Sequence, residues 1–552
     1  MTKELLSTLQ LINPDTLTSE QARFILSCLE EFYQIILNQG EEIQRLKDEI
    51  NRLKGEQGKP DIKGAKKKKD QDQSKEWNDI SSESERKKEK AERQAKRVKF
   101  DGTQPVDETL DCPLEPSDLP SDAEFKGYAK SYYQTLEIKS KTILVRRAIY
   151  YSASEGKTYT APFPVGFEAG SDYTEELKAH ILMFKFGYGM SEKKILELLL
   201  NSGIQITLGT LSNIITGKGE EFSQERSDIY QASREVGSYQ QTDSTASREN
   251  GVTRHCHILS NDFYTAYFTE AKKDRMTILD ILRDKKPRQY LLSETTFDIM
   301  SYLRVSTPLI VCLGKLRADE LMDEETYLSK LAAHLGRDKL EKYKGKLLES
   351  AYLAAYHAQE PLDALVCDDA PQYKLLAVLI ALCWIHEGRH YKKLNPLFKY
   401  HRKLLEEFIV DFWSLYHDLL AYKKVPDPAK ARELEAQFDD LTAGVTGYKD
   451  LDERIIKTRK KKESLLAVLK KPELPLHNNQ SELGARVEVR FRDVSLQTRS
   501  PKGTKAKDTF FTIIQTAKKL GVNPYTYILD RVTKKFEMDS LADIIRRKAS
   551  LI

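Results

Sequence analysis

The sequence has few cysteines, and none of them is paired at the spacing that a metal site needs. The six cysteines in 552 residues are isolated from one another, and no C-x-x-C pair occurs. Zinc ribbons require paired cysteines, and small secreted domains require a dense disulfide framework, so the sequence argues against both classes. We therefore expect no zinc and a reducing compartment.

A long hydrophobic run is also missing. The longest apolar stretch, residues 375–385, is shorter than the roughly 20 residues that span a bilayer. The first residues lack the basic, apolar and small-residue pattern of a signal peptide. We expect a soluble intracellular protein with no membrane contact.

A large excess of one charge is absent too. The chain has 88 Lys and Arg residues against 84 Asp and Glu residues, a formal charge of +4. Such a balance says little about partners, so local clusters carry the argument. At roughly 100–200 residues per domain, the length implies several domains.

Changes in composition divide the chain into seven predicted segments. They are 1–56, a coiled-coil helix; 57–105, a charged flexible linker; 106–170, a small β module; 171–235, a helix-turn-helix region; 236–395, the first part of a mixed α/β core; 396–475, a helical insertion; and 476–552, a closing helix with the C-terminal region.

Residues 18–54 have the periodicity of a coiled coil. Ile36, Ile43 and Ile50 are seven residues apart, and leucines fill the other seam. Isoleucine at one seam and leucine at the other favour a parallel two-stranded coil, so we expect a homodimer. The alternative is a helix that packs on its own domain. The linker contains four consecutive lysines at 66–69, which either add affinity for phosphates or serve as a solvated spacer.

Short apolar alternations in 121–165 suggest several strands, and residues 174–217 suggest three helices. Ser191 and Thr207 are placed to start the second and third helices, with a glycine turn at 201–203 between them. Helix, short turn and helix form the helix-turn-helix layout, although any small helical bundle shares it. If the third helix contacts DNA, the candidate residues are Thr210, Asn213 and Lys218.

Three carboxylates lie in or next to elements that we expect to be neighbours in the fold. Residues 237–243 read as a strand that ends at Asp243, and 363–368 read as a strand that ends at Asp368 and Asp369. Residues 476–486 read as a helix start, capped by one of two asparagines, with Glu482 in an early turn. Two neighbouring strands and a late helix across them form the ribonuclease-H-like arrangement. Three converging carboxylates suit octahedral Mg²⁺.

Five motifs resemble bacterial insertion-sequence transposases of the DDE class, and among these the IS66 type. They are QTDST at 241–245, VCDDAPQY at 366–373, CWIHEGRHY at 383–391, NNQSELGAR at 478–486 and TAKKLGVNPYTYILD at 516–530. The resemblance implies a ribonuclease-H-like catalytic core with large helical insertions, Mg²⁺ with Mn²⁺ as a substitute, double-stranded DNA as partner, and a bacterial cytoplasm with nucleoid association. The family's second module has paired cysteines, and here only Cys112 remains.

The resemblance assigns roles to individual residues. Asp243 is the first acid and Glu482 the third. Asp368 is preferred as the second because Tyr373 follows five residues later, and Asp369 is the alternative. His386 is expected to hydrogen-bond near the site without binding the metal.

A basic stretch follows Glu482 and is expected to contact DNA phosphates through a loop at 500–503. Its members are Arg486, Arg490, Arg492, Arg499, Lys502, Lys505 and Lys507. Arg486 is the candidate that orients the scissile phosphate. The alternative is a solvated basic loop.

The predicted function is metal-dependent cleavage at transposon ends followed by strand transfer into target DNA. Two alternatives remain: a catalytically dead DNA-binding protein of architectural or regulatory type, and another ribonuclease-H-like nuclease.

Overall fold

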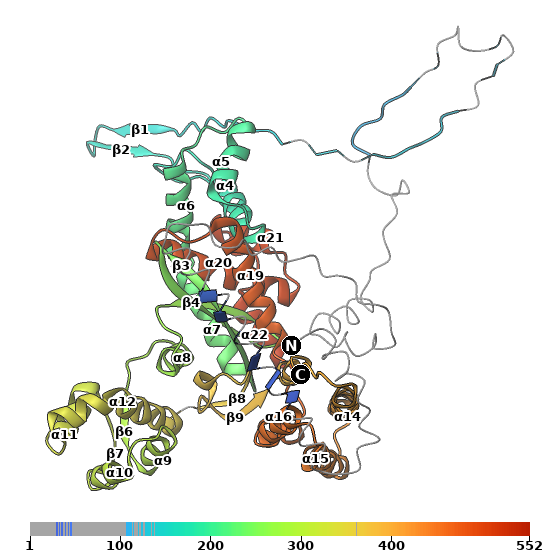
Figure 1. Cartoon of the computed structure of the whole chain (residues 1–552). Helices are drawn as coiled ribbons and strands as arrows, with labels where there is room; N and C mark the ends of the chain where they lie inside the picture. The colour runs from blue at the N-terminus through green and yellow to red at the C-terminus, as the bar shows by residue number, and fades with distance from the viewer. Residues whose placement is uncertain are drawn as a thin grey trace.

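The protein is a mixed α/β chain, mostly helical, built around one five-stranded sheet (Figure 1). The computed structural model describes residues 138–359 and 361–551, together with separate positions among 29–46 and 106–136. The predicted linker at 57–105 lies outside the described residues. Within the described part of the chain, no helix is both long and apolar enough to cross a membrane.

Most of the predicted coiled coil also lies outside the described residues. The described positions between 29 and 46 are helical. Ile36 and Ile43 are 57% and 54% exposed, whereas the carboxylate of Glu30 is buried against the imidazole of His401. Self-association through 18–54 stays a prediction.

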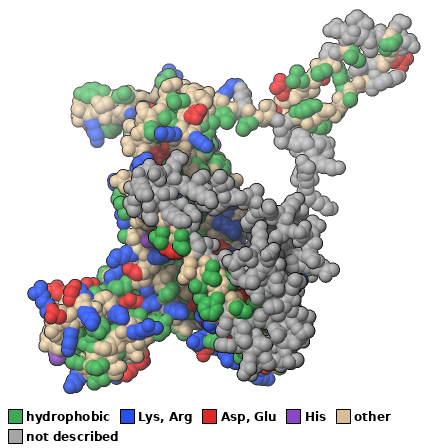
Figure 2. Space-filling view, viewed as in Figure 1, with side chains coloured by type: hydrophobic (Ala, Val, Ile, Leu, Met, Phe, Trp, Pro, Cys, Tyr) green, Lys and Arg blue, Asp and Glu red, His purple; other side chains and the backbone are tan. Residues whose placement is uncertain are grey.

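The predicted β module is a single hairpin, so the expectation of several packed strands in 121–165 is wrong for the described residues there. Its strands β1 (Ile149–Ser152) and β2 (Lys157–Thr160) are antiparallel. Large apolar side chains of this region are exposed, with Leu136 and Leu144 at 83% and 84%, and hydrophobic side chains cover much of the protruding hairpin in Figure 2. An alternating pattern yields a packed module only where a second layer covers its apolar face.

The segment between the hairpin and the sheet contains the three predicted helices and, after them, a fourth that the sequence does not predict. They are α4 (Glu175–Leu182), continued by the π-helical turn η4 (Met183–Gly187), then α5 (Glu192–Asn201), α6 (Leu208–Glu221) and α7 (Ser223–Val236). Ser191 and Thr207 cap α5 and α6 by accepting from the backbone N–H groups of Lys194 and Thr210. A short side-chain oxygen satisfies a first-turn donor, which is why these residues start helices.

The central sheet has the strand order β5-β4-β3-β8-β9. Its strands are β3 (Gln240–Glu249), β4 (Val252–Ser260), β5 (Thr265–Glu270), β8 (Leu362–Cys367) and β9 (Ala377–Leu382). The first three form an antiparallel meander, and β3, β8 and β9 are parallel. The predicted end of the first strand at Asp243 is wrong: β3 continues to Glu249 because β4 pairs along its whole length.

A helical lobe is inserted between β5 and β8. Its elements are α8 (Arg275–Leu282), β6 (Tyr290–Leu292), α9 (Glu294–Tyr302), α10 (Thr307–Gly314), β7 (Ala318–Met322), α11 (Glu324–Ala332) and α12 (Arg337–Gln359). The sequence predicts only helices here, so the β6–β7 pair is a correction. Both strands are short, too short for a clear period-2 pattern. Figure 2 shows Lys and Arg interspersed with Asp and Glu over this lobe.

A second group of helices follows β9, as predicted for a helical insertion without strands. It comprises α13 (Trp384–Lys392), α14 (Lys399–Lys424), α15 (Pro428–Ala443), α16 (Lys449–Arg459), α17 (Lys462–Leu465) and α18 (Ala467–Lys470). Trp384 is fully buried and donates its indole N–H to the carbonyl of Leu465 at 2.8 Å. This contact joins α13 to the helices of the insertion.

The C-terminal helices cover the sheet and its outer edge. They are α19 (Asn479–Ser495), α20 (Pro501–Leu520), α21 (Pro524–Val532) and α22 (Leu541–Ala549). The predicted loop at 500–503 is wrong, because Ser500 caps α20 and Pro501 is its first residue. Proline is common there, since its missing N–H has no helical partner at that position.

Helix α20 closes the free edge of β5 with three side chains spaced four residues apart. Asp508, Thr512 and Thr516 accept from the backbone N–H groups of alternate β5 residues at 2.7, 3.1 and 3.2 Å. Four residues of helix rise about 6 Å and two residues of strand about 6.7 Å, so the two repeats match. The edge strand therefore has no row of open donors along α20.

Candidate active site

The first two predicted acids lie on β3 and directly after the neighbouring parallel strand β8. Gln240 and Gln241 of β3 pair with Leu365 and Val366 of β8. The same register, continued along both chains, places Asp243 beside Asp368. Adjacent strands are roughly 4.8 Å apart, so the two carboxylates share one short segment of the sheet edge.

The third acid reaches this place on α19, which crosses the face of the sheet that carries Asp243. A Cβ on Gly484 would lie 2.7 Å from Ile258 Cγ2, and Ile258 is the cross-strand partner of Asp243. Further along α19, Glu488 accepts from Ser247 Oγ at 2.6 Å. Position 484 lies two residues after Glu482, and only a glycine there allows the helix to approach the strands this closely.

The start of α19 is attached to β3 in a way that the sequence did not predict. Asn478 is the N-cap residue, but its side chain makes no capping hydrogen bond. Its Nδ2 donates instead to the carbonyl of Thr242, at 3.4 Å. The expected asparagine cap is therefore wrong, and the amide joins the helix to the strand residue just before Asp243.

The environment of Asp243 favours its protonated form when no cation is present. Burial, the largest cause, and the charges of Glu482 and Asp368 raise the pKa of this carboxyl, and the net result is a pKa of about 7. The backbone N–H of Ser244, which donates to Asp243 Oδ1 at 2.7 Å, and the Arg389 guanidinium oppose this rise in the pKa. The positive charge near Asp243 therefore does not offset burial and the neighbouring carboxylates.

Two residues of α13 complete the surroundings of Glu482. His386 Nε2 lies 3.7 Å from Glu482 Oε1, and Arg389 lies 3.8 Å from Oε2. Burial lowers the pKa of His386, which favours the neutral imidazole. The sequence placed His386 near the site but did not single out Arg389. His386 and Arg389 are three residues apart on one helix, and this spacing is the sequence signal that could have identified Arg389.

Asp369, the alternative second acid, is engaged elsewhere. Its Oδ2 lies 2.5 Å from Lys461 Nζ, and its Oδ1 lies 3.4 Å from Lys374 Nζ. The Lys461 and Lys374 ammonium groups outweigh the effect of burial and lower the pKa of the carboxyl. Asp368 instead turns back on its own loop, where it accepts from the N–H of Ala370 at 3.1 Å. The geometry favours Asp368 as the acid that faces Asp243.

Tyr373 lies where the predicted spacing from Asp368 requires it. Its hydroxyl donates to Ser244 Oγ at 3.3 Å, beside Asp243. It belongs to the 3-10 turn η5 (Pro371–Tyr373) that follows the second acid. This contact fixes the loop after β8 against β3.

The donor set of the site suits a hard divalent cation. Asp243, Asp368 and Glu482 supply carboxylate oxygens, the ligands that Mg²⁺ prefers. Cys383, His386 and Glu482 form a second set, with ligand atoms within 4.8 Å of one another. Burial raises the pKa of the Cys383 thiol to about 11, so the thiol is protonated at neutral pH and lacks the thiolate form that binds metals.

Two of the predicted DNA contacts are wrong because their ammonium groups are buried in ion pairs. Lys218 is 4% exposed and lies 2.8 Å from a carboxylate oxygen of Glu175. Lys507 is 1% exposed and donates to Glu488 Oε1 at 2.9 Å. Position 507 lies on the buried face of α20, so its lysine points inward although it belongs to a basic stretch of the sequence.

The other predicted DNA contacts differ in exposure. Exposed members are Asn213, Arg490, Arg499, Lys502 and Lys505, and partly buried ones are Thr210, Arg486 and Arg492. Arg492 donates to the carbonyl of Ala246. The predicted third helix and the basic stretch are neighbours, since Gly219 of α6 packs on Ala506 of α20 and Lys502 lies 3.7 Å from Glu220.

Comparison with known proteins shows that part of the chain, including two of the three acids, is similar to a transposase family. Residues 344–506, which include Asp368 and Glu482, match the model described as Transposase IS66 family. The chain is also 29% identical over 297 residues to the uncharacterized protein y4jO of Sinorhizobium fredii (strain NBRC 101917 / NGR234), covering 53% of this chain and 91% of that protein. No solved structure matches this chain. The resemblance to IS66 transposases is confirmed by the family match, which indicates a transposase.

Proposed function

We propose that this chain is a DDE transposase that cleaves DNA at transposon ends and transfers the freed strand into target DNA. The observation that carries the proposal is the convergence of Asp243, Asp368 and the helix of Glu482 at one place on the sheet. Asp243 lies on β3, Asp368 directly follows the neighbouring parallel strand β8, and the late helix packs on the same sheet; this arrangement supports the ribonuclease-H-like core that we propose.

The three carboxylates would hold a pair of Mg²⁺ ions. Ions bound there would supply Lewis-acid activation of a water or a 3′-hydroxyl and charge stabilisation for the leaving oxygen. The residues around them have separate tasks. Asn478 and Gly484 hold α19 against β3, so that Glu482 stays in place. His386 and Arg389 approach its two oxygens and position that carboxylate.

DNA would be bound by α6 together with the exposed basic residues of α19 and α20. These elements lie side by side (Figure 1), so end recognition and backbone contacts would share one surface. The expected dimer through 18–54 would bring two transposon ends together.

The test is cleavage of the element's own end sequences by the purified full-length protein with Mg²⁺. Asp243→Asn is expected to abolish cleavage and strand transfer while end binding persists. Equal activity in this variant would remove the assignment. End binding without cleavage by the unaltered protein, under Mg²⁺ or Mn²⁺, would favour a catalytically dead DNA-binding protein. Cleavage without strand transfer would favour another nuclease of this fold.

A further inference from the structure

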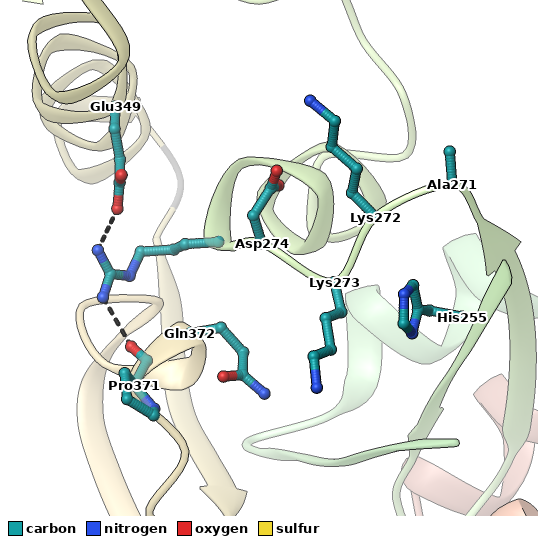
Figure 3. A pocket seen from close by; sticks show the side chains of 9 residues that line it. His255, Ala271, Lys272, Lys273, Asp274, Glu349, Pro371 and Gln372 are labelled. Atoms are coloured by element: carbon teal, nitrogen blue, oxygen red, sulfur yellow. Dashed lines mark hydrogen bonds and ion pairs between the residues drawn. The ribbon is translucent and has the colours of Figure 1, made fainter. Parts of the chain in front are cut away.

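A pocket of about 540 Å³ opens beside the candidate active site (Figure 3). It is lined by residues from β4, from the β5–α8 connection, from α12 and from η5, among them His255, Lys272, Lys273 and Gln372. Lys273, Gln372 and His255 lie around the same opening in Figure 3. The size falls in the range of roughly 300–1,000 Å³ that is common for ligand pockets, but the lining is mainly polar and basic.

The pocket lies at the same edge of the sheet as the carboxylates. β5 is antiparallel to β4 and β4 is antiparallel to β3, so β5 runs in the same direction as β3 and β8. Lys272 and Lys273 follow the carboxyl end of β5, as Asp368 follows that of β8. Ligands of open α/β sheets bind outside these strand ends. β5 is three strands from β8, a lateral separation of about 14 Å, and its last residue, Glu270, is level with Ala246 of β3, three residues beyond Asp243.

The two lysines of the pocket differ from its other charged residues in their partners. Among the described residues, no acidic side chain forms an ion pair with Lys272 or Lys273. Asp274 Oδ1 accepts from both the N–H and the hydroxyl of Thr277 at the start of α8. Glu349 is paired with Arg275, which also donates to the carbonyl of Pro371 at 2.7 Å. Lys272 and Lys273 are exposed and accessible to an anion, and the lining, with Arg275 paired to Glu349, holds these two lysines against one remaining carboxylate, that of Asp274.

The turn η5 connects this pocket to the catalytic acids. Pro371 and Gln372 line the pocket, and the next residue, Tyr373, contacts Ser244 beside Asp243. Arg275 holds η5 to α8 and α12 from the pocket side. The pocket and the carboxylates are therefore connected through one short turn.

We propose that Lys272 and Lys273 bind backbone phosphates of the DNA strand near the scissile position, in a pocket that is separate from the α6 and α20 surface. This inference rests on the proposed function only in taking DNA as the ligand. Phosphate neutralisation by lysine releases counterions, so each contact contributes about 0.9 to the slope of log affinity against log salt.

The experiment measures binding of a short fluorescent DNA duplex by the full chain in EDTA, over a series of salt concentrations. The double substitution Lys272→Gln and Lys273→Gln is expected to lower the salt slope by about 2. The matched control is Lys315→Gln with Lys339→Gln, two exposed lysines of the inserted lobe, and the slope should stay unchanged. The proposal would be overturned by an unchanged salt slope in the first variant or by an equal loss of slope in both variants. Absence of DNA binding by the unaltered protein would also overturn it.

A second measurement identifies the residues directly. Bound duplex should protect Lys272 and Lys273 from an amine-acetylating reagent, as read by mass spectrometry, and leave Lys339 reactive. Equal reactivity of the three lysines with DNA bound would contradict DNA binding at Lys272 and Lys273. Because both measurements omit the metal, they are separable from catalysis. Binding with the full slope but no cleavage under Mg²⁺ would reject the proposed enzyme and retain the pocket.

Discussion

Lys507 donates to Glu488 Oε1 at 2.9 Å inside the protein, between α20 and α19. Both side chains are almost fully buried, and Ser247 of β3 donates to the same carboxylate oxygen. The pair thus joins two C-terminal helices to the strand of Asp243. Its position explains why a lysine from a basic stretch serves the architecture of the site and does not contact DNA.

Removing one partner of this pair should destabilise the protein. We expect Lys507→Met to reduce the free energy of unfolding by about 3–5 kcal/mol, because Glu488 is left as an uncompensated buried charge. Adding Glu488→Met should restore most of the loss. Urea unfolding measures both. The control is Lys505→Met, an exposed neighbour on α20, with little effect on stability. Unchanged stability in Lys507→Met with weaker DNA binding would support a surface role.

Substituting the two adjacent acids after β8 should give different results. Asp368→Asn should abolish Mg²⁺-dependent cleavage, because this carboxylate lies beside Asp243 in the strand register. Asp369→Asn should retain cleavage and lose the ion pair with Lys461, at a cost of about 1 kcal/mol or less for a partly exposed pair. Single-turnover cleavage of end DNA compares them. Loss of activity in Asp369→Asn alone would exchange the two assignments.

Adding one methyl group at Gly484 should move the helix that carries Glu482. The Cβ of Gly484→Ala would meet Ile258 at 2.7 Å, and overpacking of this kind costs about 1–3 kcal/mol. We expect both lower stability and slower cleavage. Gly345→Ala in α12 is the control, since nothing lies within 4 Å of its added Cβ, and a helical alanine should stabilise by about 0.5–1 kcal/mol. Equal melting temperatures for the two variants would contradict the close approach of α19.

The side chains of α20 should protect the outer edge of β5. Thr512→Val removes the acceptor of the Tyr267 N–H, and an unsatisfied buried donor costs about 1–3 kcal/mol. Hydrogen exchange of the Tyr267 amide should become faster. The control is Thr442→Val in α15, a buried threonine whose hydroxyl donates to the carbonyl of Phe438 in its own helix. Unchanged exchange at Tyr267 would show that another group satisfies this amide.

Acid should destabilise the fold through His257. Burial lowers the pKa of this imidazole, His255 adds to the effect, and Glu270 and Asp274 oppose it. The folded state therefore binds fewer protons than the unfolded state just below the ordinary histidine pKa, and stability falls as the pH falls through that window. His257→Gln should reduce this loss by up to about 1.4 kcal/mol for each pH unit. Urea unfolding at about pH 8 and about pH 5 measures the difference, and equal losses in the two proteins would contradict it.

Much of the helical content could be predicted from local chemistry. Ser191 and Thr207 start helices because a short hydroxyl satisfies first-turn donors, and this depends only on nearby residues. The meander of β3, β4 and β5 was likewise expected from its turns. Local sequence patterns gave wrong predictions where a segment has no packing partner, or where its partner lies far away in the sequence. The apolar residues of 121–148 alternate like strands, but those that the structure describes, such as Leu136 and Leu144, are exposed.

The sequence by itself determined most of the helices and the strands of the central meander, the three candidate acids, and the resemblance to IS66 transposases, because short-range periodicity, capping and motif order need no knowledge of distant contacts. Only the tertiary structure decided that Asp368 faces Asp243 while Asp369 pairs with Lys461, that Arg389 approaches Glu482, and that Lys218 and Lys507 point inward. Those outcomes depend on strand register and on which face of a helix meets the core. Both are set by packing between residues far apart in the chain.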